Sequence, residues 1–242
     1  MPRNRTAILK EEDIVKRVIA GIETTVNKFR EHPYYFFTES DIVSYLWREL
    51  YSSHLEVENS GRRMYLVHRE YPTNFTYEKK NLGPNYIPDG TEGSRGHYDL
   101  VILNPQFAAN EPVDGVVFKR FNRSSPTQGG VLIALEFKYV IKDTRDFCTQ
   151  VCQDNHILRI GREKSGTKYA ANLVFCNYRM ERYRSELERM IQDSPEDIPC
   201  FLIQAWYEKN TRTGNYDKRT PKPLPSAPAT FLKKHWTKDE CT

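Results

Sequence analysis

Residues 131–140 read Val-Leu-Ile-Ala-Leu-Glu-Phe-Lys-Tyr-Val. Nearly every position is apolar, which is typical of a strand covered on both faces in the centre of a sheet. Because successive side chains of a strand point to opposite faces, Glu136 and Lys138 share one face. A buried acid beside a buried base is costly unless the two are paired or bind a metal ion. The stretch therefore indicates either a functional site or a salt-bridged face near the strand end.

The segments around this strand predict an α/β protein. Apolar residues at helical spacing predict a helix over about 10–30. Thr38, with Asp41 three residues on, is a good N-cap for a second helix that ends near Ser52. The other expected elements are strands at 64–71 (stopped by Pro72), 97–103, 169–177 and 200–208, a loop at 81–96, and helices at 143–160 (with Gly161 as C-cap) and 179–191.

Length and composition fit one sizeable domain with appendages. The 242 residues divide into an N-terminal helical segment at 1–36, a core domain at 37–208 and a C-terminal tail at 209–242. Without a long apolar run, a signal peptide or a regular cysteine pattern, we expect a cytoplasmic protein that spans no membrane.

The tail carries most of the basic excess. The net charge of the chain is +4, and between Lys209 and Lys238 eight Lys or Arg residues face one acid, Asp217. Several prolines predict an extended linker, after which Phe231, Leu232 and Trp236 are available to dock on the domain. A basic, extended segment is typical of phosphate contacts, and the tail residues expected to bind nucleic acid are Lys218, Arg219, Lys222, Lys233 and Lys234.

A second acid strengthens the functional interpretation of Glu136 and Lys138. Asp99 begins the apolar part of the neighbouring strand, in Gly-His-Tyr-Asp-Leu-Val-Ile-Leu. If the two strands pair antiparallel, Asp99 lies beside Glu136. Two adjacent carboxylates repel each other, and a divalent cation relieves that repulsion.

Asp99, Glu136 and Lys138, on consecutive strands flanked by helices, resemble the PD-(D/E)xK superfamily of restriction-endonuclease-like nucleases. The resemblance covers roughly residues 38–208. It implies an α-β-β-β-α-β core with a mixed sheet between helices, Mg²⁺ or Mn²⁺ dependence, and hydrolysis of nucleic-acid phosphodiesters. Asp99 and Glu136 would be metal ligands and Lys138 the catalytic lysine. The 36 residues between Asp99 and Glu136 exceed the tight hairpin of many members, and no proline precedes Asp99.

Many members of this superfamily add an acid from the helix that precedes the sheet. Glu49 lies near the centre of that helix's apolar face, so we favour it as a further catalytic and metal-binding residue. Glu39 is the alternative, although its position in the first turn also explains it as a helix-dipole partner. Glu70, on the first strand, is a further candidate whose other interpretation is an exposed strand position.

Three more residues are candidates for supporting roles. Asp154 and Gln150 lie in the apolar stripe of the helix after Lys138, where superfamily members often place a charged residue or a glutamine. Asp154 is alternatively an anchor that pairs with Lys142. His97 is close to Asp99, where a structural hydrogen bond is the other interpretation.

The sequence thus predicts a Mg²⁺-dependent DNA nuclease. RNA as a substrate and a homodimeric state are left open. The alternative function is a catalytically silent nuclease-like domain that binds nucleic acid or a protein partner, and a coincidental Glu-x-Lys strand in an unrelated α/β protein is the third interpretation.

Overall fold

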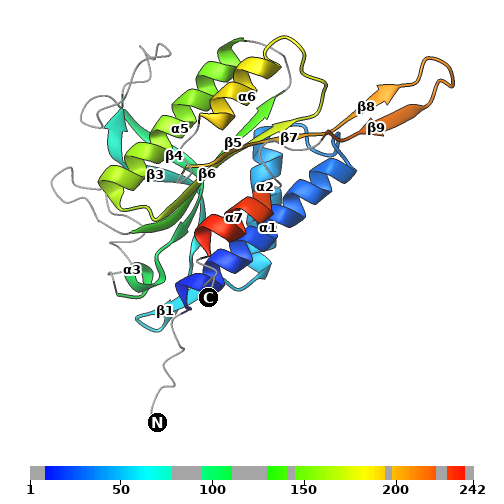
Figure 1. Cartoon of the computed structure of the whole chain (residues 1–242). Coiled ribbons are helices and arrows are strands. Elements are labelled where there is room, and N and C mark those ends of the chain that lie inside the picture. Colours follow the sequence, from blue (N-terminus) through cyan, green and yellow to red (C-terminus); the bar gives the residue numbers. More distant parts are fainter. Residues whose placement is uncertain are drawn as a thin grey trace.

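A mixed five-stranded sheet forms the centre of the chain (Figure 1). The computed structural model describes residues 9–77, 94–110, 130–140, 145–193, 198–221 and 228–237. The described helices are α1 (Glu11–Glu31), α2 (Glu39–Ser52), α3 (Pro105–Asn110), α5 (Arg145–Ser165), α6 (Arg184–Gln192) and α7 (Pro228–Trp236). The described strands are β1 (Glu56–Asn59), β2 (Arg62–Tyr65), β3 (Val67–Tyr77), β4 (Ser94–Leu103), β5 (Val131–Val140), β6 (Tyr169–Cys176), β7 (Cys200–Gln204), β8 (Trp206–Lys209) and β9 (Tyr216–Arg219).

The sheet has the order β3-β4-β5-β6-β7. β3, β4 and β5 pair antiparallel, whereas β5, β6 and β7 are parallel. From α2 to β6 the elements follow the order α2, β1, β2, β3, β4, α3, β5, α5 and β6, in which β1 and β2 form a separate hairpin. The predicted α/β class with a mixed sheet flanked by helices is confirmed.

Helices cover both faces of the sheet, so the central strands are buried as their composition predicts (Figure 1). α5 and α6 lie on one face, where Val140 packs with Val151, Val174 and Leu187. α1, α2 and α7 lie on the other face. No helix in the described part of the chain combines the length and the apolar character needed to cross a bilayer.

The helix starts agree with the expected local signals. Thr38 caps α2: its side chain accepts a hydrogen bond from the Asp41 amide, while the Asp41 carboxylate accepts one from the Thr38 amide. α1 covers the predicted span and buries its apolar face. Local hydrogen bonding and helical periodicity are therefore sufficient to place these two helices.

Several predicted boundaries are wrong. The strand expected at 64–71 is divided between β2 and β3, and the helix expected at 179–191 begins only at Arg184. The boundaries at Pro72 and Gly161 also differ. Pro72 does not stop the strand. β3 lies at the edge of the five-stranded sheet, and an edge strand tolerates a proline because the missing amide hydrogen can fall on the side without a partner strand. Gly161 does not cap its helix, because α5 continues to Ser165. A Cβ atom at Gly161 would lie 2.1 Å from the Tyr98 hydroxyl oxygen, so this glycine permits close packing of the helix.

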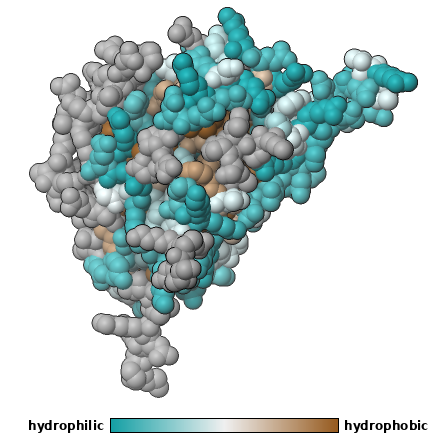
Figure 2. All heavy atoms as spheres, in the orientation of Figure 1, coloured by the Kyte–Doolittle hydropathy of each residue, from teal (hydrophilic) through white to brown (hydrophobic). Residues whose placement is uncertain are grey.

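The segment after the sheet also differs from the expectation. The strand predicted at 200–208 is split at Ala205 into β7 and β8, and β8 pairs with β9 to form a two-stranded arm, residues 206–219. Figures 1 and 2 show this arm projecting from the body with a mainly hydrophilic surface. α7 returns to the body, where Leu232 and Trp236 are buried in the core as proposed.

Candidate active site

The candidate site lies where β4 and β5 separate. Their antiparallel pairing ends at Leu100 and Leu135. Beyond this pair β4 stays bonded to β3, and β5 stays bonded to β6 as far as Val140. Within the described part of the chain, the outer part of β5 therefore has one edge without a neighbouring strand, and Glu136 and Lys138 lie on this part.

Two carboxylates occupy the place of the missing strand. Asp99 Oδ2 accepts a hydrogen bond from the Phe137 amide at 2.7 Å, and Glu39 Oε2 accepts one from the Tyr139 amide at 3.2 Å. Buried backbone amides need a partner, so the separation of the strands itself requires acceptors at these two positions. This requirement brings an acid of β4 and an acid of α2 to the same edge of β5.

Glu136 is buried without sufficient compensation. Glu136 is only 4% exposed, and its Oε1 atom has no hydrogen-bond partner among the described residues. Burial raises the pKa of Glu136 well above its usual value, and the nearby charges of Asp99 and Asp154 and a hydrogen bond with Asp99 raise it further. The positive charge of Lys138 lowers the pKa of Glu136, but by less than burial and the neighbouring acids raise it. A carboxyl group in this environment favours a proton or a cation.

Lys138 lies between two other acids. Its Nζ atom is 3.2 Å from Asp154 Oδ2 on α5 and 3.5 Å from Glu39 Oε2 on α2. Burial alone would lower the pKa of Lys138, but the charges of Asp154, Glu39 and Asp99 outweigh burial and raise it. The lysine is therefore held as an ammonium group, which can orient or neutralise an anion.

The acids outnumber the base. Asp99, Glu136, Asp154 and Glu39 are four potential negative charges, and Lys138 is one positive charge, so the group carries a net charge of −3 when every member is ionised. Burial raises the pKa of Asp154 to about 7, despite the opposing effect of Lys138. Burial likewise raises the pKa of Glu39. Excess negative charge in a poorly solvated place is what a bound cation relieves.

The helix acid at this site is Glu39, not Glu49. Glu49 forms an ion pair with Arg48 at 3.0 Å, and no contact joins it to Lys138 within the described residues. α2 meets the site with its first turn rather than with the middle of its apolar face, which corrects the preference drawn from helical periodicity. The sequence did carry a signal: Asp41 completes the capping box, so Glu39 was not needed to explain how the helix starts.

The structure separates the other candidates. Asp154 contacts Lys138, whereas Gln150, Glu70 and His97 are exposed. Glu70 is exposed in the edge strand β3, as its other interpretation expects, although its φ of 48° departs from extended strand geometry. Lys142, the alternative partner for Asp154, lies outside the described residues.

The predicted nucleic-acid contacts fall in two places. Lys218 and Arg219 belong to the arm, and Lys233 and Lys234 belong to α7, which packs against α1. Lys222 lies outside the described residues. The tail is therefore not one continuous basic strip.

Asp99 and Glu136 contact each other through a hydrogen bond. In the described part of the chain, no three His, Cys, Asp or Glu side chains form a group that could hold a metal ion. No disulfide joins the described cysteines. Burial raises the pKa of Cys152 and raises that of Cys200 to about 12, so both remain thiols.

Comparison with known proteins identifies no relative: no protein-family model, no curated protein and no solved structure matches this chain.

Proposed function

We propose that this chain is a metal-dependent nuclease with a restriction-endonuclease-like core that hydrolyses phosphodiester bonds of DNA. One observation carries the proposal: where β4 and β5 separate, Asp99 lies beside Glu136, and Lys138 lies on the same strand two residues later. An acid pair next to an ammonium group has the chemistry needed to bind a cation and to handle a phosphate anion.

The acid pair fits Mg²⁺ or Mn²⁺. Mg²⁺ usually takes only one or two protein carboxylates and keeps several waters, so a cage of three side chains is not required. Among the described residues, the buried Glu136 Oε1 has no hydrogen-bond partner, and Glu136 lies beside Asp99, whose charge raises the pKa of Glu136. Asp99 and Glu136 would hold the ion. When bound, such an ion polarises a phosphoryl oxygen and makes a bound water a better nucleophile.

The remaining residues act on charge and position. The Lys138 ammonium group orients the attacking water or neutralises negative charge that develops on the phosphate. Glu39 and Asp154 keep Lys138 charged and fix its direction from two different helices. Glu39 also holds the Tyr139 amide, so it links the position of Lys138 to the edge of β5.

A second function has one observation in its favour. Lys138 is engaged by two acids, and such a contact also serves to anchor α2 and α5 to the sheet without any catalysis. The chain would then be a nuclease-like domain that binds nucleic acid or a protein. This alternative requires no divalent ion.

The experiment that separates the two functions is a cleavage assay on purified protein. Linear, circular and single-stranded DNA, together with RNA, are incubated with Mg²⁺, with Mn²⁺ and with EDTA. The nuclease proposal expects divalent-dependent cleavage that Asp99→Ala abolishes. Binding of any of these nucleic acids without cleavage under all ionic conditions supports the alternative and overturns the nuclease proposal.

A further inference from the structure

An exposed group of aromatic side chains lies next to the candidate site. Tyr34, Tyr35 and Phe37 are 48%, 59% and 79% exposed and form what we term the aromatic platform. They lie in the connection between α1 and α2. A protein rarely leaves three large aromatic side chains in water within four residues unless they contact a ligand or partner.

The platform is held close to the site by its neighbours. Phe36, inside the same connection, is buried against Phe29, and its carbonyl oxygen accepts a hydrogen bond from the Tyr139 hydroxyl at 2.8 Å. The Phe37 amide donates to Asp41 Oδ2 at 3.0 Å, at the start of α2. Glu39 follows two residues after Phe37, so a ligand on the platform is next to the candidate active site.

The platform continues onto the arm. The Tyr34 and Tyr207 rings lie 5.3 Å apart, and the Tyr34 hydroxyl donates to the Tyr207 carbonyl oxygen at 3.4 Å. The Tyr207 hydroxyl donates to the carbonyl oxygen of Glu31 at 3.2 Å, at the end of α1. These contacts fix the base of the arm against the platform.

One face of the arm combines aromatic and basic side chains. Tyr207 pairs directly with Lys218, and Lys209 pairs directly with Tyr216. Directly paired residues share a face of a two-stranded ribbon, as do residues two positions apart along a strand. Two tyrosines and two lysines therefore alternate on this face. Neither Lys209 nor Lys218 makes an ion pair within the described residues, and both are exposed.

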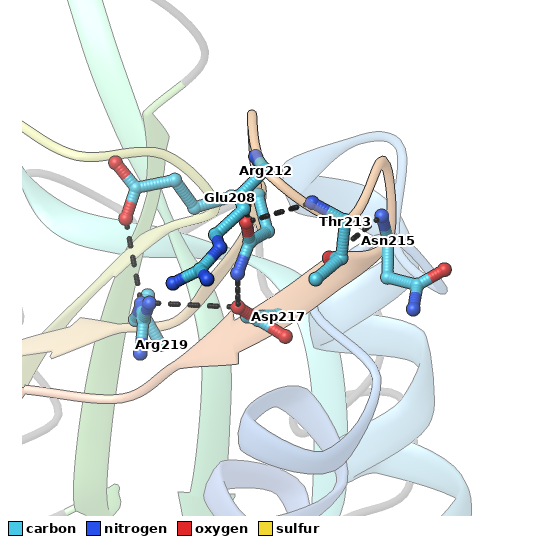
Figure 3. Close-up of polar contacts among 7 residues, drawn as sticks. Glu208, Arg212, Thr213, Asn215, Asp217 and Arg219 are labelled. Carbon is cyan, nitrogen blue, oxygen red and sulfur yellow. Dashed lines mark hydrogen bonds and ion pairs between the residues drawn. The ribbon is translucent and has the colours of Figure 1, made fainter.

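The opposite face of the arm differs in charge. Arg219 lies 3.4 Å from Glu208 and 3.7 Å from Asp217, and Figure 3 shows the three side chains together with the turn that joins the strands. The arm thus carries its acids together with Arg219 on one face, and on the other it carries two lysines without an ion pair among the described residues. This asymmetry identifies the face of Tyr207 as the binding face.

We propose that the aromatic platform and the binding face of the arm bind single-stranded nucleic acid and guide it to the candidate active site. Unpaired bases stack on Tyr34, Tyr35 and Phe37, and Lys209 and Lys218 contact the phosphates. Aromatic rings interleaved with basic side chains are the usual means of holding single strands, since every unpaired base has a face for stacking, whereas bases in a duplex are already stacked. This inference rests on the proposed nuclease function and specifies its substrate class.

The test measures binding in EDTA, so that it does not depend on cleavage. Fluorescence anisotropy follows a labelled oligothymidylate and a duplex of equal length with wild-type protein and variants. Wild type is expected to bind the single strand more tightly. Tyr34→Ala with Phe37→Ala is expected to weaken binding by roughly 5- to 150-fold per stacked base lost. Lys209→Gln with Lys218→Gln is expected to reduce the slope of log affinity against log salt by about 1.4, because each single-strand phosphate contact contributes about 0.7.

Two matched controls test whether position matters rather than residue type. Tyr65→Ala removes a tyrosine that is 36% exposed on β2, whose partner strand β1 lies at the other end of the molecule from the arm (Figure 1). Lys10→Gln with Lys16→Gln removes two exposed lysines at the start of α1. Both controls are expected to keep the affinity and the salt slope of wild type. Far-UV circular dichroism confirms that all variants are folded.

The outcomes separate this inference from the proposed function. Equal or tighter binding of the duplex, or unchanged affinity of the platform variants, overturns the inference even if Mg²⁺-dependent cleavage is found. A platform variant that changes only the oligomeric state of the protein identifies a contact between copies and also overturns it. Single-strand binding through these residues without cleavage upholds the inference and counts against the nuclease.

Discussion

Glu136 and Lys138 alternate on one face of a strand, yet their surroundings act on their charges in opposite directions. Burial and neighbouring acids raise the pKa of Glu136 and so favour its neutral form. The same acids raise the pKa of Lys138 and so favour its charged form. A cation beside Asp99 would restore the carboxylate at Glu136, because opposite charge favours ionisation. At the scale of single residues, these opposed effects support the proposed ion site.

Substitution of Lys138 and substitution of Asp99 should therefore have different effects on cleavage and on divalent-ion binding. Lys138→Ala is expected to lose about 10²–10³-fold in cleavage rate, because one contact to transition-state charge is lost, while divalent binding persists. Asp99→Ala is expected to lose cleavage and divalent binding together. Isothermal titration with Mn²⁺, run beside the cleavage assay, measures both properties. If wild type binds no divalent ion, or if Lys138→Ala unfolds the protein, the group is a structural salt bridge.

Glu39 and Glu49 give a matched pair of variants on one helix. Glu39→Gln keeps an oxygen for the Tyr139 amide but loses the charge that faces Lys138, so cleavage should fall by about 10- to 100-fold, as for other residues that orient catalytic groups. Glu49→Gln removes only a surface pair with Arg48 and should leave the rate unchanged. Comparison of kcat for the two variants decides between them, and the reverse result would return the role to Glu49.

At the scale of elements, the approach of α5 to β4 depends on the absence of a side chain. The backbone of Gly161 faces Tyr98, which is only 1% exposed. α5 also carries Asp154, so the packing at Gly161 helps to set where Asp154 meets Lys138. The close packing at Gly161, near the end of α5, therefore helps to fix the position of Asp154 in the middle of the same helix.

Gly161→Ala should destabilise the protein despite the better helix propensity of alanine. The added Cβ atom would lie 2.1 Å from the Tyr98 hydroxyl oxygen, and overpacking of this kind typically costs about 1–3 kcal/mol. Urea unfolding measures the loss. Tyr98→Phe combined with Gly161→Ala removes the closest atom, so a double-mutant cycle should show partial recovery. Additive effects would mean that the helix moves away without strain.

At the scale of the whole molecule, the buried acids make folding depend on pH. The pKa of Asp154 is about 7 in the folded protein, against an ordinary value of 3.8. The folded state therefore binds more protons than the unfolded state between these values, and the contribution of this group to stability falls as pH rises. Glu136 acts in the same direction, because its pKa is also raised.

The Asp154→Asn variant isolates this contribution. In EDTA, the free energy of unfolding of wild type relative to the variant should fall by roughly 2–4 kcal/mol between about pH 4 and pH 7. Urea titrations at several pH values, with both proteins in the same buffers, provide the measurement. Addition of Mg²⁺ near pH 7 should stabilise wild type, because an ion that binds only the folded state shifts the equilibrium toward it. A relative stability that stays constant or rises with pH would contradict the raised pKa.

The sequence by itself determined the features that depend on near neighbours along the chain. The Thr38–Asp41 cap follows from hydrogen bonds across one turn, and the shared face of Glu136 and Lys138 follows from the alternation of a strand. The apolar composition of 131–140 was sufficient to place β5 inside the sheet, since a strand without a polar face must be covered on both sides.

The tertiary structure alone decided which residues meet across the chain. Helical periodicity identifies the buried face of α2 but not the point where that helix meets the sheet, and for this reason it favoured Glu49. In the structure, the unpaired edge of β5 contacts the first turn of α2, where Glu39 accepts a hydrogen bond from the Tyr139 amide. The close approach at Gly161 and the pairing that separates Tyr207 and Lys218 from Glu208 likewise arise from contacts between distant segments. Such contacts depend on how whole elements cross, a property that no local pattern of residue types encodes.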